Sequence, residues 1–185
     1  IRSVVMAQNS NFRVFCDMFA GTGVVGREFK ASHQIISNDI LFFAYVLNAA
    51  HNGLPNNPDF SRLKKKLGHD PIDFLNKLSP KESDVAESDF MTLSYSPAGE
   101  AGRQYLTVRN ALKIDRIRQT ISQWLKSNDI SEAESFYFLA SLIESVPSVS
   151  NTTGTYGAYL KHWDNRALKP IELNHLEIVE TPHVN

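Results

Sequence analysis

The feature that most constrains the fold is a short apolar segment followed by an acid and a loop with two glycines. Residues 14–16, Val-Phe-Cys, precede Asp17, and glycines stand at positions 21 and 23. A helical pattern then runs from Val24 to Lys30. This order predicts a buried strand, a tight loop and a helix. Gly21 and Gly23 have no Cβ, so the backbone there can adopt positive φ and approach a ligand closely.

A second segment of the same kind follows where a nucleoside-binding sheet requires it. Residues 34–38 are predicted to form a strand, and Asp39 follows them. In open α/β folds, an acid about 20 residues past the glycines binds ribose hydroxyls. Ile40 would then pack on an adenine face. The alternative is that Asp39 only caps a helix over residues 40–48. We expect strands 14–17 and 35–38 to be adjacent and parallel.

Three stretches of the chain are similar to one protein family. Asp17-Met18-Phe19-Ala20-Gly21-Thr22-Gly23 resembles the D-x-F-x-G-x-G motif of S-adenosylmethionine-dependent DNA methyltransferases. More specifically, it resembles the Dam-like class of adenine-N6 methyltransferases of type II restriction-modification systems, as do residues 95–103 and 150–161. The resemblance implies an α/β fold, with a partial Rossmann-like S-adenosylmethionine-dependent methyltransferase core and a mostly helical target-recognition insertion.

The resemblance also implies which residues bind S-adenosylmethionine and double-stranded DNA. The expected cofactor-binding residues are Asp17, Phe19, Ala20, Gly21, Thr22, Gly23, Asp39 and Ile40. The expected DNA-binding residues are Arg103, Asn151, Thr152, Tyr156, Tyr159, Lys161 and Arg166. Aromatic and basic residues interleave between Tyr156 and Arg166, a pattern that suits base stacking and phosphate contact. On composition alone, a surface loop with half-buried aromatic residues is equally compatible.

Composition and charge say less about function than these motifs do. The chain has 185 residues, a net charge of −1 and one cysteine, Cys16. A single cysteine cannot form a disulfide within the chain, which suits a reducing compartment, and we expect a cytoplasmic protein without a membrane span. Six basic residues between positions 103 and 126 are accompanied by one acid, Asp115. Such a surface can hold a phosphate backbone, although a solvated helix face explains a charge run equally well.

The chain is predicted to contain three parts. Residues 1–59 would form the S-adenosylmethionine-binding portion, residues 60–170 the helical insertion, and residues 171–185 a return to the core. Helices are expected over 60–67, 71–78, 110–126 and 136–146, the last after a capping box of Ser131 and Glu134. Phe90 to Tyr95 is predicted to be a strand or a loop, and Glu172 to Glu180 to end in a strand.

The Asp-Pro-Pro-Tyr-type motif that binds the target amine in this family is absent from these residues. We therefore assign no catalytic residue and no metal ligand, and expect the 185 residues alone to be inactive. A cognate restriction endonuclease is expected in the same system, without stable contact. Two alternatives to an adenine methyltransferase remain open: a non-catalytic DNA-binding module that retains the fold, and a methyltransferase that acts on RNA or a small molecule.

Overall fold

A computed structural model describes residues 1–8, 11–154 and 157–182, and the chain divides into two compact units. Unit 1 comprises Ile1–Ser61, Ile130–Ser141 and His175–Asn185, and unit 2 comprises Arg62–Asp129 and Leu142–Asn174. One helix, α8 (Glu132–Ser145), contributes residues to both. The three-part division expected from the sequence concerns function, and it stays a prediction.

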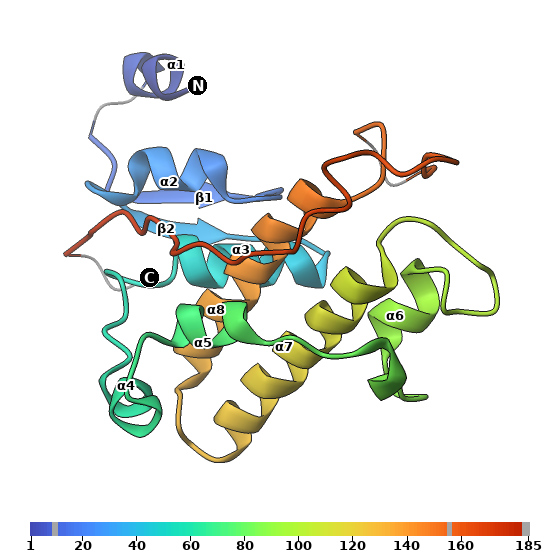
Figure 1. Ribbon diagram of the computed structural model, residues 1–185. Coiled ribbons are helices and arrows are strands. Elements are labelled where there is room, and N and C mark those ends of the chain that lie inside the picture. The colour runs from blue at the N-terminus through green and yellow to red at the C-terminus, as the bar shows by residue number, and fades with distance from the viewer. Residues whose placement is uncertain (9–10, 155–156, 183–185) are drawn as a thin grey trace. The chain divides into compact units, whose positions relative to one another are not determined.

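Unit 1 contains two parallel strands with helices before, between and after them (Figure 1). Its elements are α1 (Arg2–Gln8), β1 (Val14–Asp17), α2 (Val24–Lys30), β2 (Gln34–Ser37) and α3 (Phe42–His51). The strands pair with Val14 opposite Gln34 and Asp17 opposite Ser37. This register confirms that the two predicted strands are adjacent and parallel.

Helix α2 packs against both strands through its apolar face. Phe29 is fully buried, and its ring stacks on Phe15 of β1 with 4.2 Å between the ring centroids. Full burial of such a side chain contributes about 1.5–3 kcal/mol. Lys30, at the end of α2, is also buried, and its ammonium donates to the carbonyl oxygens of His51 and Leu54. One lysine therefore caps the carboxyl end of α3.

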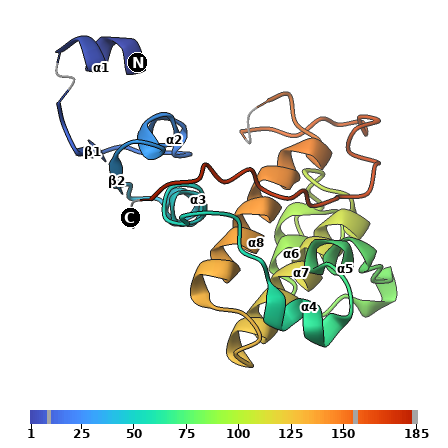
Figure 2. The same ribbon diagram turned by 90° about the vertical axis from the view of Figure 1, so that its left-hand side faces the viewer.

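Unit 2 is helical (Figure 2). Its elements are α4 (Ser61–Leu67), α5 (Pro71–Lys77), η1 (Glu82–Asp84), α6 (Phe90–Tyr95), α7 (Val108–Lys126) and η2 (Val146–Val149). The apolar stripe predicted for the longest of these helices is confirmed, because its four members are buried in α7: Ile114, Ile117, Ile121 and Trp124. The helical character expected for this part of the chain is thereby confirmed.

The helix starts read from the sequence are made by side-chain caps. Asp70 accepts a hydrogen bond from the Ile72 N–H at 2.8 Å, with Pro71 at the first helical position. Before α8, Ser131 Oγ accepts from the Glu134 N–H, and Glu134 Oε2 accepts from the Ser131 N–H at 2.7 Å. Each bond satisfies a backbone donor that the first helical turn leaves without an intrahelical partner. The predicted capping box is confirmed.

Two expectations about local structure are wrong. Phe90–Tyr95 is the helix α6, and not a strand or loop. Its first turn is held by Asp115 of α7, whose carboxylate accepts from the N–H groups of Met91 and Thr92 at 3.0 and 2.8 Å. Residues 172–180 form no strand, because the described part of the chain offers them no ladder partner. The observed fold is mixed, mostly helical, with a small parallel sheet, and a wider Rossmann-like core stays a prediction.

Candidate functional site

The loop between β1 and α2 is a tight turn tied to the end of β2. The Ala20 N–H donates to the Asn38 carbonyl oxygen at 2.9 Å, and the Gly23 N–H donates back to the Ala20 carbonyl oxygen at 2.8 Å. Gly21 and Gly23 have φ of +51° and +76°, in the left-handed region that glycine adopts readily. We call residues 20–23 the glycine loop. Its conformation is the one that the two glycines predicted.

Asp39 joins this loop directly. Its Oδ2 accepts from the Gly21 N–H and its Oδ1 from the Leu41 N–H, both at 2.9 Å. These bonds, first that of Leu41 and then that of Gly21, hold the pKa of the Asp39 carboxyl below its ordinary value, so the group is charged at neutral pH. The structure therefore brings together two features that lie 18 residues apart in the sequence. Asp39 is not the cap of α3, which begins at Phe42 with Leu41 at its N-cap and no side-chain cap bond, so the alternative that Asp39 only caps this helix is wrong.

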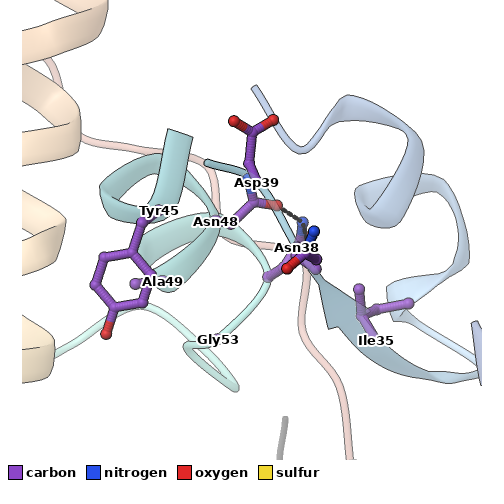
Figure 3. Close-up of a pocket in the computed structure, with 9 residues that line it drawn as sticks. Ile35, Asn38, Asp39, Tyr45, Asn48, Ala49 and Gly53 are labelled. Atoms are coloured by element: carbon purple, nitrogen blue, oxygen red, sulfur yellow. Dashed lines mark hydrogen bonds between the residues drawn. The ribbon is translucent and has the colours of Figure 1, made fainter. Parts of the chain in front are cut away.

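A hollow of about 270 Å³ lies beside Asp39, between β2 and α3. Figure 3 shows Ile35 and Tyr45 at its two ends, with Asp39 and Asn48 between them. The glycines at 21 and 23 do not line this hollow. A Cβ built on Gly21 would meet no atom within 4 Å, so the loop is open to solvent at that residue. A ligand that contacts both Asp39 and the glycine loop would rest on this open surface.

The remaining expected cofactor residues surround the loop. Phe19 and Ile40 are almost fully exposed, at 89% and 97%. Thr22 is exposed as well, whereas Ala20 is buried and acts through its backbone. Asp17 accepts from the Phe19 N–H at 3.3 Å, which organises the start of the loop. Two apolar side chains left in water beside a charged carboxylate fit a ligand with an aromatic base and hydroxyl groups.

Sequence reasoning missed two asparagines that contact the glycine loop from α3. Asn48 donates to the Gly21 carbonyl oxygen at 3.0 Å, and Asn52 donates to the Gly23 carbonyl oxygen at 3.2 Å. Both side chains are buried. The signal was present, because two amides four residues apart fall on the same face of an otherwise apolar helix.

Three of the expected DNA-binding residues, Asn151, Thr152 and Tyr159, lie on a loop of unit 2 that Asn151 closes. The Asn151 side chain is fully buried, donates to the Leu160 carbonyl oxygen at 3.0 Å and accepts from the Asp164 N–H at 3.0 Å. Thr152 and Tyr159 form an antiparallel bridge within the same loop. Thr152 is buried too, so of these three only the half-buried Tyr159 has an accessible side chain. Tyr156 lies outside the described residues.

The basic residues expected to bind DNA differ in whether their side chains already form bonds within unit 2. Lys161 is exposed, whereas Arg166, also exposed, donates to the Thr152 carbonyl oxygen at 2.8 Å. Arg103 is exposed and donates to the Ser94 carbonyl oxygen at 2.9 Å. On α7, Lys113 is buried and Arg116 forms a bidentate pair with the buried Asp89. The basic run between residues 103 and 126 is therefore partly structural, and less of it faces solvent than its sequence indicates.

A glycine loop and an acid at the carboxyl ends of adjacent parallel strands are typical of proteins that bind a nucleoside-containing cofactor. Comparison with known families specifies the class further. Residues 1–183 match the family described as D12 class N6 adenine-specific DNA methyltransferase, and the chain belongs to that family.

Several curated proteins are similar over most of the chain. The chain is 45% identical to the Type II methyltransferase M.FokI of Planomicrobium okeanokoites, over 93% of this chain and 26% of that protein. It is 43% identical to the modification methylase StsI of Streptococcus sanguinis, over 93% and 26%. It is 36% identical to the Type II methyltransferase M.NlaIII of Neisseria lactamica, over 92% and 48%. The chain thus spans between about a quarter and a half of the length of these relatives.

The comparison with solved structures found no match. Within residues 1–8, 11–154 and 157–182, none of the helices combines the length and the apolar character that a membrane crossing needs.

Proposed function

We propose that the protein is a site-specific DNA methyltransferase that transfers a methyl group from S-adenosylmethionine to the N6 amine of adenine in duplex DNA. The observation that carries this proposal is the bond between the Asp39 carboxylate and the Gly21 N–H, at the ends of two parallel strands. Family membership and the names of the relatives, which are Type II methyltransferases and modification methylases, support the reaction and its place in restriction-modification.

The residues around the glycine loop fit this methyl donor. The charged Asp39 can accept hydrogen bonds from ribose hydroxyls, because each carboxylate oxygen has a further lone pair. Phe19 and Ile40 offer apolar surface to an adenine ring, and the open side of Gly21 admits the amino-acid portion. Asp17 either organises the loop alone or also contacts the donor's ammonium. When bound, S-adenosylmethionine would supply a methyl group on a sulfonium sulfur; the adenine amine would take this methyl group and lose a proton, and S-adenosylhomocysteine would be the leaving group.

The acceptor amine lies inside the base stack of a duplex, so the target adenine must leave the stack before it can react. We propose that unit 2 holds the duplex, with Lys161, Arg103 and Arg166 near phosphates and the loop closed by Asn151 near the bases. Asn151 would act by holding this loop, because its own side chain is buried. A restriction endonuclease of the same specificity would act on unmethylated sites, without stable contact with this protein.

The donor site is tested by removing the Asp39 carboxylate. In the full-length protein, Asp39→Ala should weaken binding of S-adenosylhomocysteine by about 1.5–3 kcal/mol, the value of a hydrogen bond to a charged group. Asp59→Ala is a matched control, since Asp59 accepts from the N–H two residues ahead, as Asp39 does, and has no bond to the glycine loop. Isothermal titration calorimetry measures both. Equal affinities for the parent and Asp39→Ala would remove Asp39 from the site.

The acceptor is tested by incubating the protein with radiolabelled S-adenosylmethionine and duplex DNA, and by identifying the methylated base after hydrolysis. We expect N6-methyladenine at one sequence. DNA binding without methyl transfer by the full-length protein would favour a non-catalytic DNA-binding module. Methylation of RNA or of a small molecule, and not of DNA, would refute the proposed substrate.

A further inference from the structure

Two asparagines, Asn48 in α3 and Asn52 at its C-cap, hold the glycine loop through its backbone carbonyl groups. Asn48 and Asn52 are one helical turn apart, and 7% and 3% of their surface is exposed. The Asn48 amide donates to the Gly21 carbonyl oxygen, and the Asn52 amide donates to the Gly23 carbonyl oxygen. We call this pair the asparagine bracket. It reaches both glycines of the loop from one helix face.

The bracket is itself fixed in orientation. The Asn52 amide also donates to Asn48 Oδ1 at 2.8 Å and to Ser37 Oγ at 3.4 Å, while the Asn48 amide donates to the Ala44 carbonyl oxygen at 2.9 Å. These bonds connect the loop to α3 and to the end of β2. At its carboxyl end α3 is capped by the buried Lys30, which donates to the carbonyl oxygens of His51 and Leu54 on either side of Asn52. The bracket therefore stands on a helix that cannot shift freely along its axis.

The loop and the bracket are in close contact. A Cβ on Gly23 would lie 2.6 Å from Asn48 Oδ1 and 2.8 Å from Asn52 Nδ2, closer than two such atoms can approach. Gly23 is thus required by the bracket as well as by its φ of +76°. Gly21 differs, because its missing Cβ faces open space. One glycine serves the contact with α3, and the other leaves the outer surface of the loop free.

The bracket also decides which way the loop's N–H groups point. In a trans peptide the C=O and the following N–H point in opposite directions. Since the Gly21 carbonyl oxygen is turned toward Asn48, the Thr22 N–H is turned away from α3, toward the exposed side of the loop. A backbone donor directed outward can bind an acceptor atom of a ligand, such as a carboxylate oxygen.

We propose that Asn48 and Asn52 are positioning residues for the methyl donor. They do not contact the reacting atoms. They hold the loop carbonyl groups toward α3, and thereby present the Thr22 N–H and the open face of Gly21 to the ligand. The inference rests on the proposed function, because it concerns the same site.

The test uses isosteric variants of the full-length protein. Asn48→Asp and Asn52→Asp keep the side-chain shape and remove the N–H donors to the loop. Asn110→Asp is a matched control in unit 2, where the Asn110 amide likewise donates to two backbone carbonyl oxygens, those of Ala167 and Lys169. The dissociation constant of S-adenosylhomocysteine is measured by calorimetry at a temperature at which circular dichroism shows every variant folded.

We expect the dissociation constant to rise roughly tenfold or more for each bracket variant, since at least one hydrogen bond that fixes the loop is lost, and less than twofold for the control. In methylation assays, the KM for S-adenosylmethionine should rise for the bracket variants while the KM for DNA stays within twofold of the parent. A general loss of stability would not produce this split.

The outcomes separate the two claims. Absence of binding of either S-adenosylmethionine or S-adenosylhomocysteine by the parent would refute the proposed function. If the parent binds and the dissociation constants of the bracket variants lie within twofold of the parent's, the inference alone is overturned. An equal rise in the dissociation constant of the control variant would overturn it as well. Should an aspartate variant not fold, Asn52→Ala takes its place, because alanine introduces no charge at the C-cap of α3. Its dissociation constant should rise about fivefold, and an unchanged value would overturn the inference.

Discussion

The contact between α2 and the asparagine bracket predicts that the effect of Gly26→Ala on the free energy of unfolding changes sign when the Asn52 side chain is removed. Gly26 lies in the middle of α2, where alanine should be better than glycine by about 1 kcal/mol because of helix propensity. However, a Cβ there would lie 2.7 Å from Asn52 Nδ2 and 3.1 Å from Ile35 Cγ2. The first distance requires the Asn52 amide to move, which would break its bond to the Gly23 carbonyl oxygen.

The magnitude follows from these two opposing effects. Insertion of a methyl group into a packed site typically costs about 1–3 kcal/mol. With the gain of about 1 kcal/mol in helix propensity subtracted, Gly26→Ala should destabilise the parent by up to about 2 kcal/mol. In an Asn52→Ala background the 2.7 Å contact is gone, and only the flexible Ile35 methyl must give way. There Gly26→Ala should be neutral or stabilise by up to about 1 kcal/mol, a coupling of about 2 kcal/mol.

Urea denaturation followed by circular dichroism measures the free energy of unfolding for the four proteins of this cycle. Asn48→Ala is the control background, because the nearest atoms to a Cβ at Gly26 belong to Asn52 and Ile35 and not to Asn48. Gly26→Ala should still cost up to about 2 kcal/mol there, as it does in the parent. If the cost is the same in all three backgrounds, the packing of Asn52 against α2 is wrong, and with it the geometry of the bracket.

Three further predictions concern charge and the loop of unit 2. Burial lowers the pKa of Lys30 from 10.5 to about 8, so the folded protein releases this proton at lower pH than the unfolded chain does. Denaturant titrations should therefore show the parent gaining stability relative to Lys30→Met as pH rises from about 8 toward 10.5. Arg116→Ala should cost about 3 kcal/mol in the same assay, because it leaves the buried Asp89 carboxylate without its cation. The pair with Arg116 also holds the pKa of Asp89 below its ordinary value, so its contribution should vanish as pH falls through that lowered pKa, and a parent–variant difference that persists in acid would contradict this. For DNA binding, Lys161→Ala should lower the slope of log affinity against log salt concentration by about one unit for all sequences, as filter binding over a salt series would show. Asn151→Ala should speed the limited digestion of its loop by trypsin and weaken the binding of every duplex. A variant that matches the parent in these assays would contradict the role given to that residue.

Sequence patterns predicted the structure correctly where the stabilising contacts join neighbouring residues or repeat along one face of a helix. The strand at 14–17, the capping box of Ser131 and Glu134, and the buried stripe of α7 each follow from neighbouring residues, and each is confirmed. The bond from Gly21 to Asp39 was anticipated only as a shared location, since the order of strand, loop, strand and acid places both at one sheet edge.

Other features depend on partners that the sequence does not reveal. Phe90–Tyr95 is short and apolar enough for a strand, and it is a helix because a carboxylate 23 or 24 residues further along the chain, Asp115, binds its first turn. Between residues 171 and 178 burial alternates only in two short stretches, Ile171 with Leu173 and Leu176 with Ile178, which are out of phase, and a strand also needs a neighbour for its backbone. Asn151 was expected from the family resemblance to bind DNA, and its complete burial is a property of the folded loop that the sequence does not reveal.

The closure of that loop by a single residue affects how the protein can diversify. Asn151 joins both ends of the loop, through the Leu160 carbonyl oxygen and the Asp164 N–H, so we expect the closure of the loop not to depend on the identity of the residues between Thr152 and Tyr159. Exchange or lengthening of this stretch should therefore leave the helices intact, since loop length costs little closure entropy. Grafting it between relatives, with Asn151 retained, would test whether the proposed contact of this loop with bases sets the recognition sequence independently of the stability of unit 2.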